Sequence, residues 1–287
     1  MSIRTSIPWQ LKVAAKIVLS RLPISYHTWS KLRLFRHGCM DESQYAFDIF
    51  ERHFAHARAL QRQRKGFTIL ELGPGDSLAS ALLGKAFGCS QIYLVDVGDF
   101  AAADLAPYQQ MAAHLRESGY PIVGIEDCRT VQDVLSLCSA QYLNAGVKSL
   151  ATIAADSVDF IFSNAVLEHV RLRDFAPLCR EFRRIQRRDG IGSHTVDFKD
   201  HLQESLNNLR FSEKFWESEL ISSSGFYTNR IRPSQMLQLL RDAGFAVEVL
   251  AERRWSELPV ARRKLASPYQ DLPADELCIS GFDVLVR

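Results

Sequence analysis

The segment from Ile69 to Ser77 places the strongest constraint on how this chain folds. It reads Ile-Leu-Glu-Leu-Gly-Pro-Gly-Asp-Ser, so an apolar run leads directly into two glycines, and a helical pattern follows over residues 78–87. Glycine permits a sharp bend and a close approach of the backbone to a ligand, and the next helix begins with unpaired N–H groups. The segment therefore predicts the first strand–turn–helix unit of an open α/β sheet, with a ligand at the turn.

The rest of the chain continues this texture. From Phe67 onward, short apolar runs alternate with helical patterns, which favours βαβ units and a parallel sheet covered on both faces. We predict one α/β domain over residues 66–287, preceded by a helical N-terminal extension over residues 1–65. The predicted strands span residues 68–72, 92–97, 158–163, 191–198, 245–250 and 278–286, with a helix over 233–243.

The N-terminal extension is basic. Residues 1–40 hold seven Lys or Arg and no acidic residue, although the whole chain carries only +2, from 35 Lys plus Arg against 33 Asp plus Glu. That whole-chain balance does not indicate a nucleic-acid partner. Residues 9–22 have the pattern of a basic amphipathic helix, and a second helix is predicted from Asp41 to Gly66. Two hypotheses stay open for the first helix: peripheral contact with an anionic inner membrane, or a lid over the active site.

Cysteine usage and hydropathy bear on location. The six cysteines form no C-x-x-C pair and no evenly spaced framework, which favours a reducing cytosol. No uncharged apolar run reaches the roughly 18–20 residues that a membrane span requires. We therefore expect a cytoplasmic protein, with peripheral attachment to the inner membrane as the variant that the basic extension suggests.

A second strand ends in a carboxylate. Asp96 follows the apolar run 92–95 and lies 25 residues after Glu71. An acid at this strand end can accept hydrogen bonds from two ribose hydroxyls. Dinucleotide-binding folds share this arrangement, but their pattern requires Gly or Ala three places after Gly75, and this chain has Leu78 there.

Two motifs carry a family resemblance. Glu71-x-Gly73-x-Gly75-x-Ser77 resembles the E/D-x-G-x-G-x-G loop of class I S-adenosylmethionine-dependent methyltransferases, with Ser77 in place of the third glycine. The run over residues 156–170, D-S-V-D-F-I-F-S-N-A-V-L-E-H-V, resembles the fourth-strand region of their small-molecule families. The resemblance implies a Rossmann-like doubly wound sheet of seven strands with the last strand antiparallel, and S-adenosylmethionine as cofactor.

The resemblance also implies which residues hold the cofactor. The adenine contact stays open between two segments: residues 122–127, where Glu126 or Asp127 would accept from the adenine amino group, and residues 142–150, where Val147–Leu150 would contact the ring. We prefer the second segment. The candidate cofactor residues are Glu71, Gly73, Gly75, Ser77, Asp96, Val97, Leu150, Ser163, Asn164 and Glu168.

Candidate catalytic residues follow the predicted fifth strand, after a predicted turn at Asp189-Gly190. Open α/β sheets place substrates at the carboxyl ends of their strands, where this chain has His194, Asp197 and His201. His194 and Asp197 would face opposite sides of a regular strand, so we expect the strand to end between them. Our hypothesis is that His194, supported by Asp197 or His201, removes a proton from the acceptor.

The histidines admit two further roles. These three residues also match a metal-ligand set, but methyl transfer does not require one and no metal ion is expected. His169 is attractive as a base, although in the resembled families this histidine supports helix packing.

The acceptor is less constrained. Residues 206–211 and 225–232 combine amides, arginines and aromatic rings, which suits sugar or phosphate ligands or a solvated loop. Their texture resembles bacterial methyltransferase-domain proteins of surface-polysaccharide or secondary-metabolite synthesis. We predict a methyltransferase acting on a small-molecule or saccharide acceptor, at a hydroxyl group. The alternatives are a cofactor-binding, non-catalytic subunit and a nicotinamide-dependent oxidoreductase.

Overall fold

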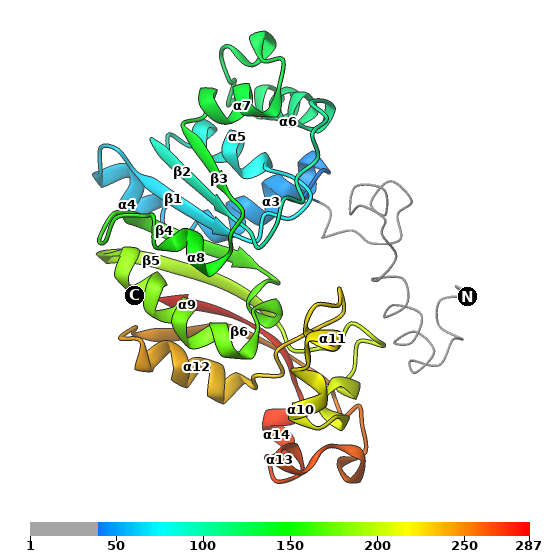
Figure 1. Ribbon diagram of the computed structural model, residues 1–287. Coiled ribbons are helices and arrows are strands. Elements are labelled where there is room, and N and C mark those ends of the chain that lie inside the picture. The colour runs from blue at the N-terminus through cyan, green and yellow to red at the C-terminus, as the bar shows by residue number, and fades with distance from the viewer. Residues whose placement is uncertain (1–39) are drawn as a thin grey trace.

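The computed structural model describes residues 40–287, which are built around one seven-stranded sheet (Figure 1). The strand order is β3-β2-β1-β4-β5-β7-β6; β1 to β5 pair in parallel, and β7 is antiparallel to both β5 and β6. This confirms the predicted Rossmann-like doubly wound sheet. The strands are β1 Thr68–Leu72, β2 Gln91–Val95, β3 Ala140–Leu143, β4 Val158–Asn164, β5 Gln186–Asp197, β6 Val247–Arg254 and β7 Ile279–Val286.

Helices cover both faces of the sheet. One core contains residues of α3 (Ser43–Phe54), α5 (Ala79–Ala86), α6 (Ala106–Glu117) and α7 (Val131–Leu137). The opposite core contains residues of α8 (Val147–Leu150), α9 (Leu172–Ile185) and α12 (Pro233–Asp242). Since β1 and β4 lie between these layers, their sequences are continuous apolar runs and not alternating ones.

The described part of the N-terminal extension packs on the sheet. The helix predicted from Asp41 is present as α3, then breaks over residues 55–57 and resumes as α4 (Arg58–Gln63). Phe50 and Phe54 of α3 lie in the same core as Phe67, Phe160 and Phe162. The predicted helix over residues 9–22 lies outside the described residues.

The structure excludes the less preferred alternative for the third strand, and the predicted turn before the fifth strand is wrong. The strand before β4 is Ala140–Leu143, whereas Glu126 and Asp127 are exposed in a 3-10 turn, η2 (Ile125–Asp127). The predicted turn at residues 189–190 lies inside β5, where Val158 pairs with Gln186 and Phe160 with Ile191. The Gln186 amide donates to the Gly190 carbonyl and closes this bulge, so β5 continues through to Asp197.

Short helices after β5 gather beyond one end of the sheet (Figure 1). They are η4 (Asn207–Arg210), α10 (Glu213–Trp216), α11 (Glu219–Ser222), η5 (Arg262–Lys264), α13 (Ser267–Gln270) and α14 (Ala274–Leu277). None of the helices described is both long and apolar enough to cross a membrane.

The amide-rich segment over residues 225–232 is largely buried. The Asn229 side-chain amide donates to the carbonyls of Leu167 and Val170, and Arg230 donates to the Phe211 carbonyl. These contacts fix the backbone after β4. The structure therefore assigns the segment a supporting role, in place of the ligand loop or solvated loop expected from its composition.

A buried ion pair joins the extension to the sheet and supports a stability prediction. The fully buried Asp159 carboxylate accepts from the Thr68 N–H at 2.8 Å and pairs with Arg64, with Arg187 at 3.2 Å. We expect Asp159→Ala to lower the free energy of unfolding by about 3–5 kcal/mol, because it leaves buried donors unpaired. Urea denaturation measures this change. Asp189→Ala, which removes an exposed partner of the same Arg64, should cost under about 1 kcal/mol, and equal losses would contradict the assignment.

Candidate active site

The carboxyl ends of the parallel strands bring candidate residues to one edge of the sheet. Gly73, Asp96, Asn144 and Ala165 each follow directly after β1, β2, β3 and β4. Backbone hydrogen bonds keep these ends in step: Gly73 N–H donates to Val95 O at 2.8 Å and Asp96 N–H to Leu143 O at 2.9 Å. This edge is where open α/β sheets bind their ligands.

The loop after β1 is held against the end of β2. Gly73 and Gly75 adopt φ of 73° and 67°, a conformation that favours glycine. The Asp96 carboxylate accepts from the Gly75 N–H at 3.0 Å and from the Val97 N–H at 2.7 Å. Asp96 therefore orients the glycine loop while remaining at the strand end that faces a ligand.

Gly73 also lies against the turn that follows β4. A Cβ at this position would meet the Val166 side chain at 2.5 Å, in addition to the cost of the positive φ. We expect Gly73→Ala to lower the free energy of unfolding by about 1–3 kcal/mol and to weaken cofactor binding, because the loop and the turn must separate. Thermal unfolding measures the first effect. The exposed Gly119→Ala, where φ is also positive but no atom lies within 4 Å, is the control; a loss as large there would attribute the effect to φ alone.

The residues at this edge fit S-adenosylmethionine. Asp96 offers carboxylate oxygens for ribose hydroxyls, and the neighbouring Val97 is an apolar side chain left 77% exposed, which suits the face of a planar ring. The Ser77 hydroxyl and one oxygen of Glu71 are buried without a hydrogen-bond partner. Buried polar atoms of this kind are normally satisfied, so a ligand at the loop would complete them.

The segment preferred for the adenine contact is the one that follows β3, but Leu150 is not placed to make it. Its side chain is fully buried in the core with Leu72 and Val95. Asn144, which directly follows β3, is exposed at this edge and was not predicted from the sequence. Asn144 can be identified as a candidate because it is the first polar residue after the third strand, but only when that strand is known to be Ala140–Leu143.

Tyr142 is a second residue that sequence analysis missed. Its hydroxyl donates to the Gly98 carbonyl at 2.8 Å and accepts from the Phe100 N–H at 3.1 Å. These bonds hold the backbone after Val97 against β3. Tyr142 therefore shapes the ring-facing side of the edge.

Burial of Glu71 makes stability depend on pH. Desolvation raises the pKa of its carboxyl from an ordinary value of 4.5 to about 8, with a smaller contribution from the Asp96 charge. Between these values the unfolded chain has lost the proton and the folded chain keeps it, so stability falls as pH rises. We expect Glu71→Gln to be more stable than the parent at pH 8, by on the order of 3 kcal/mol, and nearly equal at pH 4.5. Urea denaturation at both pH values measures the difference, and a gain independent of pH would contradict this origin.

Ser163 and His194 lie in the interior. Ser163 Oγ and His194 Nδ1 are 2.8 Å apart, and the His194 ring stacks on Phe182 with centroids 5.7 Å apart. His194 is 1% exposed, and desolvation lowers its pKa to about 3. The structure does not support the hypothesis that His194 removes the acceptor proton, because its ring is interior and weakly basic. Ser163, which is also fully buried, is not placed to touch the cofactor with its side chain.

Asn164 and Asp197 lie at the edge, at the ends of β4 and β5. Asn164 Oδ1 accepts from Arg52 of α3 at 2.8 Å. Asp197 is half-buried and accepts from the Lys199 N–H at 2.9 Å, with Lys199 Nζ at 3.4 Å. His194 and Asp197 lie on opposite faces of β5, but the strand continues through both residues, so the prediction that it ends between them is wrong.

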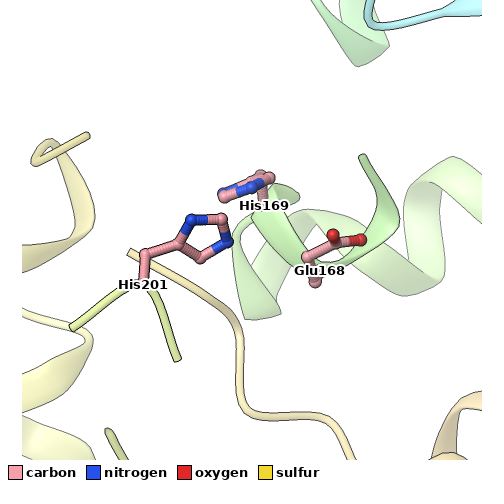
Figure 2. Close-up of side chains that lie close together, drawn as sticks. All are labelled: Glu168, His169 and His201. Carbon is pink, nitrogen blue, oxygen red and sulfur yellow. The ribbon is translucent and has the colours of Figure 1, made fainter. Parts of the chain in front are cut away.

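Glu168, His169 and His201 come together at the same edge (Figure 2). Each offers one ligating atom within 4.8 Å of the others, and the two imidazole centroids are 4.7 Å apart. Glu168 is buried, which raises the pKa of its carboxyl to about 8, with Asp197 adding to the rise. Sequence analysis named Glu168 and His201 separately, for the cofactor and for catalysis; it assigned His169 to packing.

Residues 70–193 match the family model described as a methyltransferase domain. No curated protein matches the sequence. Among solved structures, similar chains are the YcgJ protein of Bacillus subtilis (14% identity, TM-score 0.42) and an S-adenosylmethionine-dependent methyltransferase of Mesorhizobium loti (18% identity, TM-score 0.42). Each alignment covers 81% of this chain and 97% of the other.

The matched residues contain both motifs on which the family resemblance depends, the loop at 71–77 and the run through Glu168 and His169. The domain match supports S-adenosylmethionine as the cofactor, as expected. Over residues 70–193 the chain is therefore similar to methyltransferase domains, and these residues lie on a Rossmann-like sheet.

Proposed function

We propose that this protein transfers a methyl group from S-adenosylmethionine to a hydroxyl group of a small-molecule or saccharide acceptor. The observation that carries the proposal is the group Glu168, His169 and His201 beside the glycine loop. Val166, two residues before Glu168, packs against Gly73, so this group and the cofactor loop share one edge. A hydroxyl acceptor needs its proton removed, and this group offers two exposed imidazoles that can accept it.

The chain's own residues divide the work. When bound, S-adenosylmethionine supplies a methyl group already activated on a positively charged sulfur. Asp96 and the loop from Gly73 to Ser77 hold it at the carboxyl ends of β1 and β2. His201, exposed on the loop after β5, accepts the acceptor proton in this proposal, and Asp197 lies at the end of the same strand. Alignment of the acceptor with the methyl group supplies most of the rate, since proximity alone is worth up to roughly 7–11 kcal/mol.

Hydrogen bonds to Asp200 hold the loop that bears His201. The buried Asp200 carboxylate accepts from the N–H groups of Leu202 at 2.9 Å and Gln203 at 2.7 Å, and from that of Asn207. These bonds fold residues 200–207 into a fixed turn. His201 is thereby presented at the edge although it has no secondary structure of its own.

A methyl-transfer assay tests the proposal. The protein is incubated with methyl-tritiated S-adenosylmethionine and two matched acceptor panels, one of sugars and small alcohols or phenols and one of amines. We expect label in the hydroxyl panel. Transfer to amines alone would overturn the oxygen assignment, and binding of the cofactor without transfer to either panel would favour a non-catalytic subunit.

A further inference from the structure

We propose that Glu168, His169 and His201 bind a divalent first-row transition-metal ion. Figure 2 shows the three side chains, of which the first two come from the 3-10 turn η3 (Leu167–His169) and the third from the loop after β5. Two imidazoles and one carboxylate within 4.8 Å of one another form a ligand set that suits Mn²⁺, Fe²⁺, Co²⁺ or Zn²⁺ better than Ca²⁺ or Mg²⁺. Ion binding stands independently of the proposed methyl transfer; only its use in the reaction rests on that function.

The first argument is the state of Glu168. Its side chain is 2% exposed, and neither carboxylate oxygen has a hydrogen-bond partner within the described residues. Buried carboxylates are normally paired or bound to a metal ion, because an isolated buried charge is costly. A cation at this position supplies the partner that the chain itself does not.

The second argument is the orientation of His169. Its Nδ1 lies 2.8 Å from the Tyr227 carbonyl oxygen, which can only accept, so Nδ1 carries the proton and Nε2 carries the lone pair. Histidines that bind metals almost always donate their other ring N–H to a carbonyl or carboxylate in this way. Tyr227 is itself fixed, since its hydroxyl donates to Glu217 at 2.7 Å and accepts from the Leu172 N–H at 3.1 Å.

The third argument is access. His169 and His201 are exposed whereas Glu168 is buried, so an ion held by all three has the protein on one side and solvent or substrate on the other.

The spacing of the ligand atoms is close to what one ion needs. Ligand atoms around one ion lie about 3–4.3 Å apart, given metal–ligand distances of roughly 2.0–2.2 Å. The three atoms, which lie within 4.8 Å of one another, therefore need at most a small further approach. Rotation of the exposed His201 side chain can supply this movement while its backbone stays in the fixed turn.

The ion gives the proposed reaction a more specific acceptor. With three protein ligands, further coordination positions remain for water or for an acceptor oxygen. Coordination would lower the pKa of a bound hydroxyl and so ease loss of its proton to water, because the cation stabilises the negative oxygen. In this form of the site His201 serves as a ligand instead of a base. We infer that the acceptor is an alcohol or phenol that reaches the ion through the oxygen that becomes methylated.

Titration of the full-length, chelator-treated protein with Mn²⁺, followed by electron paramagnetic resonance of the free ion, tests the site. We expect one equivalent to bind, and Glu168→Gln and His201→Ala each to weaken binding at least tenfold. His56→Ala and Glu204→Gln, which change an exposed histidine and an exposed carboxylate outside the set, should bind as the parent does. Thermal unfolding of every variant confirms that it is folded.

A second titration, with S-adenosylhomocysteine in metal-free buffer, separates the two proposals. If the protein binds S-adenosylhomocysteine but not Mn²⁺, the metal site is overturned and the methyltransferase proposal stands. The same holds if Mn²⁺ binds equally well to the Glu168 and His201 variants. If Mn²⁺ binds and the Glu168 and His201 variants weaken it, but S-adenosylhomocysteine does not bind, the metal site stands and the methyltransferase proposal is overturned. Should Glu168→Gln fail to fold, the surface variant His201→Ala decides alone.

Discussion

Asp96→Ala should weaken binding of S-adenosylhomocysteine by about 100-fold or more. The substitution removes the acceptor for two ribose hydroxyls, and hydrogen bonds to a charged group are worth about 1.5–3 kcal/mol each. It also releases the N–H groups of Gly75 and Val97, so the glycine loop loses its anchor to β2. Isothermal titration of the purified variant measures the effect.

Asp99→Ala is the matched control for this prediction. Asp99 is an exposed carboxylate three residues further on, and it has no part in the strand end. It should bind the product within about twofold of the parent. Equal binding by the parent and the folded Asp96 variant would show that the ligand does not lie at the end of β2.

His201→Ala should lower kcat by about 10²–10³-fold, whereas His194→Gln should leave the rate within a few fold of the parent. The loss of a positioned proton acceptor or metal ligand costs this much in typical enzymes. His194 is interior and weakly basic, so its replacement should act on stability instead, through the lost contact with Ser163. Turnover measured with a hydroxyl acceptor, together with the melting temperature, separates the two effects.

The paired outcome makes the assignment testable. If the His194 variant folds but has no turnover while the His201 variant stays active, the proton acceptor is His194, as the sequence suggested. The assignment of His201 from the structure would then be wrong. The KM for the cofactor should stay unchanged in the His201 variant, because His201 lies after β5 and the cofactor residues lie after β1 and β2.

The sheet was predictable because its signals are local. Apolar runs such as Thr68–Leu72 fall between helical patterns, and glycines at the first turn leave few other folds open. Asp96 was predictable for the same reason, since the end of an apolar strand is visible in the sequence. The third strand was harder: Ala140–Leu143 is only four residues long and mostly not buried, so it lacks the apolar run that identifies a strand.

The catalytic group was less predictable because it depends on side-chain direction and on contacts between distant segments. His194 was expected to be accessible because the strand was predicted to end near it. In the structure β5 continues past a bulge at residues 187–190, and the His194 ring lies buried in the core. His169 and His201 meet because Asp200 folds the loop after β5 and Asn229 supports the turn after β4. Neither contact has a signature in the spacing of residues along the chain.

The acid-rich alternative for adenine failed for a related reason. Glu126 and Asp127 have suitable chemistry, but they stand in an exposed 3-10 turn between α6 and α7, away from the carboxyl ends of the strands. Residue type was informative only where topology brought the residue to the edge. Asn144, an unremarked amide in the sequence, gains its candidacy entirely from its position after β3.

Titration of the parent protein with S-adenosylhomocysteine, in parallel with NAD and NADP, tests the central claim most directly. We predict that S-adenosylhomocysteine binds at micromolar concentration. Neither nicotinamide nucleotide should bind, because Leu78 replaces the small residue that a dinucleotide loop requires. Tight binding of NAD or NADP without binding of the product would contradict the cofactor assignment and, with it, the methyl-transfer function proposed for this edge.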